Sequence, residues 1–422
     1  MRLLKGDFFS LDWGSTLAEL PSPMLVVGNP PWVTSSELGR LGSSNVPPKH
    51  GQRDHRGLDA VTGKSNFDVS ESMLFSQLKW FDQRPGTVAA LCKESVARKV
   101  LARAWYQNLP ISSARMYRFD AAAAFGVSVT ACLLVVVRDG AQGPTSCEVF
   151  EAMSADTPSE TLGFLDGLVV RNLGTYQRWR HLRGTDSNYL WRSGLKHDCA
   201  RVMELTEEGD ELRNGLGERV DIEREAVYPL FKSADIANGR DARFRKLVVV
   251  TQKQLHGDTK HLRETLPKTW LYLNSHREAF SRRSSAIYQG RPDFSMFGIG
   301  DYSFALWKVA VPGLYRVGRP TVLSPIGGRP AMLDDTAYFL PCASEGEARF
   351  LMDLLASDPA LRFFDSLAFP TDKRPVNAGI LRQLHIGKLA RELGRGGEYD
   401  SLTAIRCAQT GWGDPRRRLF DN

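Results

Sequence analysis

The sequence has none of the cysteine spacings that build zinc sites or disulfide frameworks. Its six cysteines are scattered over 422 residues, without a C-x-x-C pair and without a paired His/Cys spacing. Since structural zinc sites take their ligands from such closely spaced pairs, we expect no metal site in this chain. Reduced thiols are the expected state of these cysteines.

Long apolar runs are missing as well. No apolar stretch approaches the ~18 residues needed to cross a bilayer. The chain opens on Met1 and Arg2, then a short apolar pair, Lys5 and Asp7, which is not the pattern of a secretory signal. These absences predict a cytoplasmic protein without a membrane partner.

Charge of one sign is present only in modest excess. The formal net charge is +7 and the isoelectric point lies near 9.1. Such a surplus permits a nucleic-acid partner, because basic groups neutralise phosphates, but many proteins without that partner have it too. The hydrophobic content of 42% indicates a globular chain, which is long enough for two or three domains.

The first 140 residues alternate between strand-like and helix-like segments, which is typical of an open α/β sheet. The apolar runs and amphipathic patterns predict strands at 24–28, 87–92, 112–119 and 127–137, and helices at 71–84 and 93–108. A sheet of this kind commonly has six or seven strands, so it is expected to be short at its beginning. The polar segment 33–65 follows the first strand and has the length of a lid or binding loop.

A turn-rich stretch at 140–145 indicates a domain boundary. From about residue 150 the pattern becomes mixed α+β and richer in Arg, Trp and Tyr. Hairpin-like runs are expected at 294–310 and 321–340, and helices at 344–357 and 378–394. The Gly- and Arg-rich segment 396–422 is expected to be a basic, mobile tail.

Asn29-Pro30-Pro31-Trp32 directly follows the first predicted strand. Two consecutive prolines cannot continue a strand, because they lack amide donors and fix φ, so their carbonyls are left as acceptors. In open α/β sheets the carboxyl end of a strand is where ligands bind. The Asn side chain adds an acceptor and the indole adds a flat stacking surface. These groups suit a planar aromatic amine taken out of a DNA stack, and an ordinary turn after a strand is the alternative.

The acceptors indicate how such an amine would react. The exocyclic nitrogen of adenine is a poor nucleophile, because its lone pair is delocalised into the ring. Acceptors on its two N–H groups, the Asn29 side chain and the Pro30 carbonyl, favour a more tetrahedral nitrogen that can attack a methyl donor in line. Positioning and charge stabilisation suffice, without a metal or a covalent intermediate.

Around this motif the chain resembles the gamma-type adenine-N6 DNA methyltransferases of restriction–modification and phage-defence systems. The resemblance implies that Asn29, Pro30, Pro31 and Trp32 are catalytic. It also implies that Phe125, in an Ala-Ala-Phe-Gly-Val-Ser-Val segment, packs against the flipped base. Ordinary burial at a turn is the alternative for Phe125.

The resemblance extends to segments that contact S-adenosylmethionine in the family. Gly6-Asp7-Phe8 resembles the segment that contacts the adenine of this donor, and Asn66-Phe67 lies where the family places another contact. It therefore assigns Asp7, Phe8, Asn66 and Phe67 to the cofactor site. From the residues alone, Asp7 could equally be a turn residue and Phe67 a core anchor.

Four stretches in the second half resemble the target-recognition portion of one subgroup of the family, namely 191–198, 228–233, 298–304 and 372–375. The expected fold is therefore α/β, with an incomplete Rossmann-like methyltransferase sheet over 1–145 and a mixed α+β target-recognition region over 150–395. The resemblance implies double-stranded DNA as the partner and S-adenosylmethionine as the cofactor.

One feature of the family is missing from this sequence. The Gly-rich loop that holds the methionine part of the donor lies upstream of Gly6-Asp7-Phe8 in the family, and residues 298–300 precede a β-like run instead of opening a helix. The donor site is therefore expected to be incomplete. A second polypeptide could supply the donor half, or the chain could be a DNA-binding module without catalysis. Cytosine N4 stays open as a target, since its amine needs the same acceptors.

Basic residues outside the motif are the candidates for contacts with the DNA backbone. The residues assigned to this role are Lys49, Arg53, Arg277, Arg282, Arg283, Arg291, Lys373 and Arg374. A solvated surface charge is the alternative for each of them.

Overall fold

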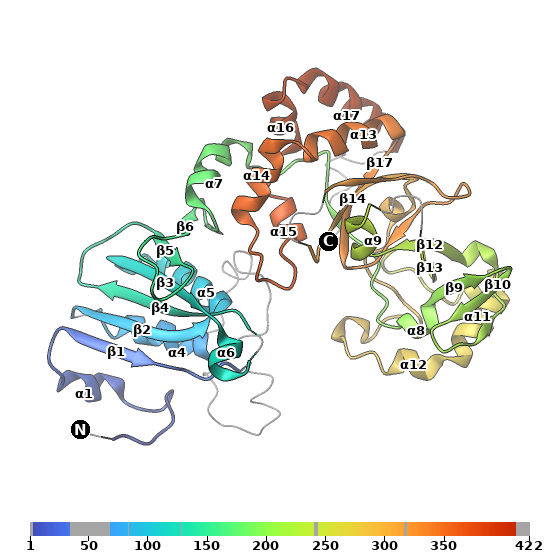
Figure 1. The fold of residues 1–422 in the computed structure, drawn as a ribbon. Helices are drawn as coiled ribbons and strands as arrows, with labels where there is room; N and C mark the ends of the chain where they lie inside the picture. The colour runs from blue at the N-terminus through green and yellow to red at the C-terminus, as the bar shows by residue number, and fades with distance from the viewer. Residues whose placement is uncertain are drawn as a thin grey trace. The chain divides into compact units, whose positions relative to one another are not determined.

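A computed structural model describes residues 3–33, 68–82, 84–127, 129–239, 244–315 and 319–410. The chain divides into two compact units, whose elements are drawn in Figure 1. The first unit comprises residues 1–178 and 365–372, and the second comprises 179–364 and 373–422. In these described ranges, no helix has both the length and the apolar character needed to cross a membrane.

The first unit is built on a seven-stranded sheet in the order β1-β2-β4-β3-β5-β6-β7. Its strands are β1 (Met24–Gly28), β2 (Gly86–Lys93), β3 (Ser113–Phe119), β4 (Ala131–Arg138), β5 (Ser146–Phe150), β6 (Glu160–Leu165) and β7 (Leu168–Val170). Its helices are α1 (Trp13–Ala18), α4 (Val69–Lys79), α5 (Glu94–Tyr106), α6 (Ala121–Phe125) and α7 (Leu173–Trp179). β1 and β2 are parallel, whereas β4 is antiparallel to both β2 and β3. The predicted α/β class is confirmed.

The spacing of apolar residues in helix α5 explains why this segment is helical and which of its faces is buried. Its buried apolar residues include Val96, Val100 and Ala104, which recur every four residues and therefore lie on one face. That face joins α4 and the central strands in one continuous core. Figure 1 shows α4 and α5 together on one side of the sheet.

Strand β1 lies at the edge of this sheet, and its two faces differ. Met24 is buried and Val26 packs against the core. Leu25 and Val27, which point to the opposite face, are 63% and 72% exposed. Parallel sheets normally have both faces covered, so this bare apolar face is unusual.

Residues 365–372 belong to the first unit although they lie far along the sequence. Phe369 enters the core of that unit, and the Arg98 guanidinium lies 3.9 Å from the centre of its ring. Arg98 also pairs with Asp372 and with Glu94. Helix α5 therefore holds this returning segment through both packing and charge.

The second unit contains two smaller sheets, in the orders β11-β10-β9-β13-β12-β16 and β15-β14-β17-β8. Its strands are β8 (Arg192–Ser193), β9 (Glu204–Glu208), β10 (Glu211–Asn214), β11 (Arg219–Val220), β12 (Val227–Phe231), β13 (Lys246–Val249), β14 (Trp307–Pro312), β15 (Thr321–Leu323), β16 (Met332–Leu333) and β17 (Ala337–Cys342). Its α-helices are α8 (Ala200–Met203), α9 (Ser233–Ala237), α10 (Leu262–Thr265), α11 (Pro267–Ser275), α12 (Arg277–Ser281), α13 (Glu345–Leu355), α14 (Asp358–Leu367, whose last residues join the first unit), α15 (Ala378–Leu381), α16 (Ile386–Glu392) and α17 (Gly396–Thr410).

Two glycines allow distant segments of the second unit to pack backbone against backbone. A Cβ at Gly194 would lie 2.1 Å from the Asp334 carbonyl oxygen, and a Cβ at Gly298 would lie 2.2 Å from the Gly194 oxygen. Gly298 also has a φ of +68°, which favours glycine. The sequence stretches around 194 and 298 therefore meet because neither residue carries a side chain.

The structure corrects two of the predicted boundaries. The first sheet does not end at 145, because β5 pairs in parallel with β3 and is followed by β6 and β7. The expectation of a mobile tail from residue 396 is wrong for 396–410, where α17 buries Tyr399 and Arg406. Residues 411–422 lie outside the described residues.

Two predicted elements of the second half are also different. The hairpin expected over 294–310 starts only at Trp307, because the preceding residues form turns and a 3-10 helix at Asp301–Phe304. The helix expected over 378–394 is divided into α15 and α16.

Candidate functional site

The Asn-Pro-Pro-Trp motif lies where β1 ends. The strand pairs with β2 up to Gly28, which is opposite Ala90, and the chain then leaves the sheet. Asn29 is exposed, Pro30 is buried and Trp32 is half-buried. The motif therefore presents its amide side chain to solvent at the carboxyl edge of a parallel strand pair.

Trp32 is fixed by contacts to the neighbouring strand β2. Its indole Nε1 donates to the Leu91 carbonyl oxygen at 3.3 Å. Its own carbonyl oxygen accepts from Lys93 Nζ at 3.0 Å, and the same ammonium lies 2.9 Å from Asp68 Oδ2. Lys93 thus links the motif to the residue that caps α4.

The segment after the motif is tied to the start of α4 as well. The Val69 amide donates to the Val33 carbonyl oxygen at 3.1 Å. Asp68 is nearly buried and its carboxylate accepts from the Ser70 amide, which caps the helix. The contacts of Asp68 and Lys93 were not predicted from the sequence, since nothing in their local pattern distinguishes them from an ordinary cap and an ordinary strand end.

Phe125 is brought to the motif by the fold. It ends α6, and its ring meets the Trp32 ring edge to face with centroids 5.9 Å apart. A similar contact of 6.0 Å joins it to Phe119 on β3. Half of its surface remains exposed. An aromatic pair, half of it supplied by the motif itself, therefore lies at this end of the sheet and offers a surface on which a flat ring can pack.

The candidate donor-contacting residues are only partly described. Asp7 lies in a turn, where its carboxylate accepts from the Phe9 amide at 2.8 Å. Phe8 packs in an aromatic cluster with Trp13 and Trp80, at centroid distances of 5.2 and 5.8 Å. Both residues are thus engaged within the chain. The other two candidates, Asn66 and Phe67, lie outside the described residues.

The candidate DNA-binding residues differ in their surroundings. Arg277 pairs with Asp293, and Arg282 pairs with Glu278 on α12. Arg283 donates to three backbone carbonyls, and burial lowers its pKa. Arg291 lies at the surface, and its guanidinium contacts His256 Nδ1 at 3.1 Å.

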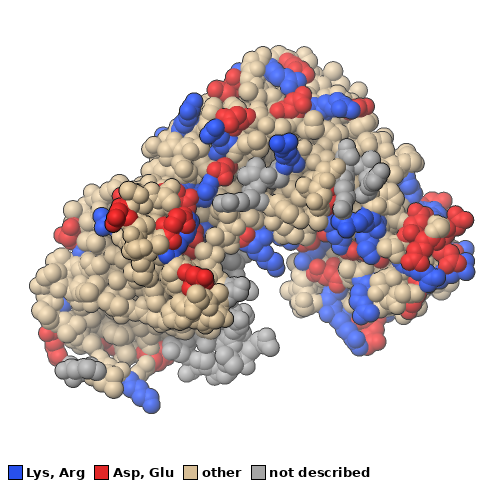
Figure 2. Space-filling view, in the orientation of Figure 1, with Lys and Arg blue, Asp and Glu red and all other residues tan. Residues whose placement is uncertain are grey.

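The remaining candidates for DNA binding are Arg374, Lys373, Lys49 and Arg53. Arg374 donates to the Asp335 carbonyl and pairs with its carboxylate at 3.1 Å, so it has a role inside the second unit. Lys373 is exposed. Lys49 and Arg53 lie outside the described residues. On the face drawn in Figure 2, basic and acidic side chains alternate over the second unit instead of forming one basic stripe.

The four stretches that resemble a recognition region gather within the second unit, apart from the first residue of the last one. Leu195 bridges to Asp334, and Lys196 bridges to Phe297. Lys232 from the second stretch pairs with Glu204 at 2.6 Å and lies 3.9 Å from Asp334. The paired residues are 28 to 139 positions apart in the sequence, so only the tertiary fold brings them together.

Comparison with known proteins agrees with this arrangement. The chain is 39% identical to the Type II methyltransferase M.NspV of Nostoc sp. over 386 residues, which cover 92% of this chain and 80% of the relative. Its fold is similar to that of the Type IIL restriction–modification enzyme MmeI, solved in complex with DNA, with a TM-score of 0.55 and 13% identity. That match covers 90% of this chain and 48% of MmeI. No protein-family profile matches the chain. The identity to M.NspV over nearly the whole chain shows that it belongs to the Type II methyltransferases of restriction–modification systems.

Proposed function

We propose that this chain carries the base-binding half of a DNA methyltransferase that transfers a methyl group from S-adenosylmethionine to adenine N6. The observation that carries the proposal is the exposed Asn29 at the carboxyl end of β1, three residues before Trp32, whose ring contacts that of Phe125. An acceptor next to two aromatic faces suits an amine on a planar ring. MmeI was solved in complex with DNA, which supports DNA as the source of that ring.

Each residue of the site would have a separate role. The Asn29 amide oxygen and the Pro30 carbonyl would accept from the two N–H groups of the target amine. Trp32 and Phe125 would hold the flipped ring, and stacking compensates the cost of leaving the duplex. Lys93 and Asp68 would fix the loop so that the acceptors do not reorganise during the reaction.

S-adenosylmethionine would supply the methyl group, but the described residues fit this donor only in part. Phe8 offers an aromatic surface, yet it packs against both Trp13 and Trp80. Asp7 closes its own turn. Asp7 and Phe8 therefore do not form a donor-binding pocket by themselves.

The bare face of β1 supports the proposal that further residues complete the donor site. Leu25 and Val27 are apolar, exposed and on the edge strand that leads into the motif. A helix packed on this face would cover Leu25 and Val27, and a strand paired in parallel to the free edge of β1 would bring its own carboxyl end next to Asn29, because parallel strands end at the same side of a sheet. A second polypeptide is the source that we propose for this strand.

An assay of methylated nucleosides tests the proposed reaction. Duplex DNA is incubated with S-adenosylmethionine and the chain, alone and mixed with polypeptides encoded next to it, and the digested nucleosides are separated by mass. We expect N6-methyladenine in the completed enzyme. Asn29→Ala should abolish it while DNA affinity changes by less than about twofold, and Asn29→Asp, which keeps one acceptor, should retain part of the rate.

Other products of the same assay would contradict the proposal in different ways. N4-methylcytosine would keep the site but change the target base. DNA binding without any methylation, in every mixture, would favour a base-recognition module. Full activity of Asn29→Ala would remove Asn29 from the mechanism.

A further inference from the structure

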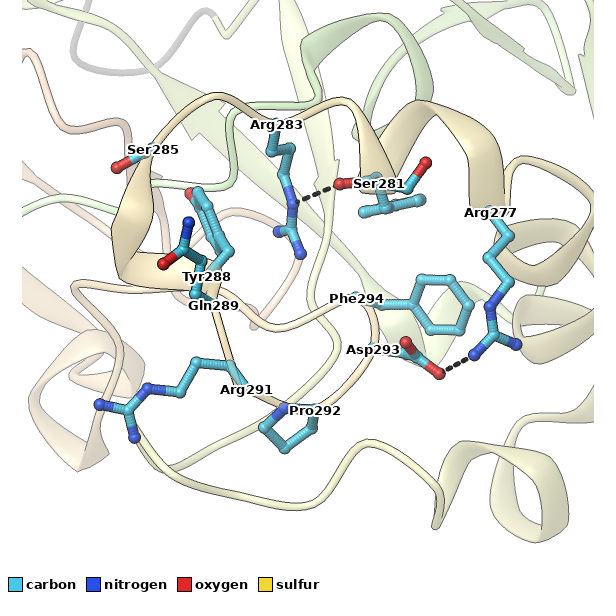
Figure 3. A pocket seen from close by; sticks show the side chains of 11 residues that line it. Arg277, Ser281, Arg283, Ser285, Tyr288, Gln289, Arg291, Pro292, Asp293 and Phe294 are labelled. Carbon is cyan, nitrogen blue, oxygen red and sulfur yellow. Dashed lines mark hydrogen bonds and ion pairs between the residues drawn. The ribbon is translucent and has the colours of Figure 1, made fainter.

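A pocket lies in the second unit, between α12 and the residues that follow it. Figure 3 shows Arg277 and Arg291 on opposite sides of this pocket and Arg283 between them. Its volume is about 260 Å³. The lining residues are Arg277, Phe280, Ser281, Arg283, Ser285, Tyr288, Gln289, Arg291, Pro292, Asp293 and Phe294.

The charges around this pocket do not cancel. Three arginines face one carboxylate, that of Asp293, which pairs with Arg277. The partner of Arg291 is an imidazole nitrogen of His256, which carries no negative charge. No carboxylate of the described residues pairs with Arg291 or Arg283 in an ion pair. The lining therefore carries two positive charges that an anion could neutralise.

Arg283 is held in place mainly by backbone carbonyls and a ring face, and the Asp198 carboxylate acts on it electrostatically without a direct ion pair. Its guanidinium donates to the carbonyl oxygens of Ser295 at 2.8 Å, Phe280 at 3.2 Å and His197 at 3.3 Å. Its central carbon lies 3.7 Å from the centre of the Tyr288 ring. A half-buried guanidinium whose direct contacts are carbonyl dipoles and a ring face stays attractive to an anion.

The floor of the pocket is rigid. Phe294 is fully buried although its φ is +61°, a conformation that costs free energy for a bulky residue. Its carbonyl oxygen accepts from Thr251 Oγ1 at 2.9 Å, and its ring meets Phe280 at 4.9 Å. The surrounding core therefore maintains the strained backbone at Phe294, and this turn places the nearby Arg291 and Asp293 in the lining of the pocket.

From this geometry we infer that the pocket binds a single phosphate group of the DNA backbone. Arg291 is the contact residue and Arg283 is a positioning residue that keeps the local charge fixed. A guanidinium suits a phosphate because its planar donors match two of the oxygens. The inference rests on the proposed function for its DNA partner, but it distinguishes Arg291 from Arg282, which does not line the pocket.

The two arginines allow a matched test by DNA binding alone. Fluorescence anisotropy with a labelled duplex, over a series of salt concentrations without phosphate buffer, compares Arg291→Gln with Arg282→Gln. Each variant loses one positive charge from an exposed residue. Arg291→Gln should weaken binding to all sequences alike and reduce the slope of log K against log salt by about 0.9. Arg282→Gln should leave the slope unchanged.

A second measurement distinguishes binding of a DNA backbone phosphate from binding of free inorganic phosphate. Thermal unfolding is followed with and without inorganic phosphate for the wild type and for Arg291→Gln. If phosphate stabilises the wild type alone but the salt slopes of both variants equal that of the wild type, the pocket takes free phosphate and the inference is wrong.

The remaining outcomes distinguish a failure of the phosphate pocket from a failure of the proposed function. Equal slopes for both variants, with DNA bound by the wild type, overturn the pocket and leave the proposed function standing. A loss confined to certain DNA sequences would mean that Arg291 reads a base instead. No DNA binding by the wild type at low salt would overturn both.

Discussion

At the residue scale, Lys93 connects the Asn-Pro-Pro-Trp motif to helix α4. Its ammonium bonds both the Trp32 carbonyl oxygen and the Asp68 carboxylate. Asp68 is only 5% exposed, so removal of Lys93 would leave a buried carboxylate without its ion-pair partner. The side chain that orients Trp32 therefore also stabilises the first unit.

Replacing Lys93 by Met should lower the free energy of unfolding by about 1–3 kcal/mol, because a nearly buried carboxylate loses its partner. Urea denaturation measures this loss. In an Asp68→Asn background the same replacement should cost at least about 0.5 kcal/mol less, since the two residues are coupled. Strictly additive effects would show that the contact does not contribute. Lys93→Arg is expected to restore most of the stability.

Lys308 on β14 gives the second unit a dependence on pH. The side chain is fully buried, its ammonium donates to the Ala305 carbonyl oxygen at 2.5 Å, and burial lowers its pKa to about 7. The unfolded chain would hold the proton up to about pH 10.5. Between these values the unfolded state binds more protons, so stability rises with pH.

Lys308→Met should therefore stabilise the protein at pH 7, by an amount of the order of a few kcal/mol, and the gain should shrink toward pH 10. Below pH 7 the gain should level off, because the group is then charged in both states. Urea unfolding at several pH values measures this. The exposed Lys260, changed to Met, serves as the control and should show no such trend. A gain that is independent of pH would contradict the assignment.

At the scale of elements, β1 has two faces with opposite surroundings. Val26 packs against the core, whereas its neighbour Val27 is 72% exposed. An apolar edge strand of this kind is a common site of association between chains. The strand that carries the motif to its position is thus also the one with an uncovered surface.

Threonine substitutions distinguish the two faces of β1, since threonine is β-branched, as valine is, and suits a strand. Val27→Thr together with Leu25→Thr should change the free energy of unfolding by less than about 0.5 kcal/mol and reduce self-association. Val26→Thr, the matched control, should cost about 1 kcal/mol or more, because it places a hydroxyl against the core. Thermal unfolding and light scattering read out both effects. Equal destabilisation by the two changes would contradict the exposed face.

At the scale of the whole molecule, the first unit is discontinuous in sequence. Arg98 on α5 stacks on Phe369 and pairs with Asp372. Arg171 similarly pairs with Asp365 and donates to its carbonyl. Charged groups that are half-buried and paired in this way are costly to separate, so the returning segment is firmly part of the first unit.

Much of the first unit was predictable from the sequence. The strand before Asn29, the strands and helices that follow it and the amphipathic face of α5 all have local signatures, because periodicity reports which side of an element is buried. The later strands β5–β7 were missed as members of the same sheet. They join the sheet through the pairing of β5 with β3, which links residues about 30 positions apart and leaves no local pattern in the sequence.

The candidate site divides in the same way. The sequence by itself determined the chemistry, because an Asn followed by two prolines and a Trp supplies acceptors and a stacking face wherever a strand ends. Only the tertiary structure decided that Phe125 meets Trp32, that Lys93 fixes the motif and that Arg291 differs from Arg282. The first two contacts join residues that are far apart in the chain, and the difference between the two arginines depends on which side chains lie next to each of them. The motif and its chemistry are local, whereas its surroundings are set by packing.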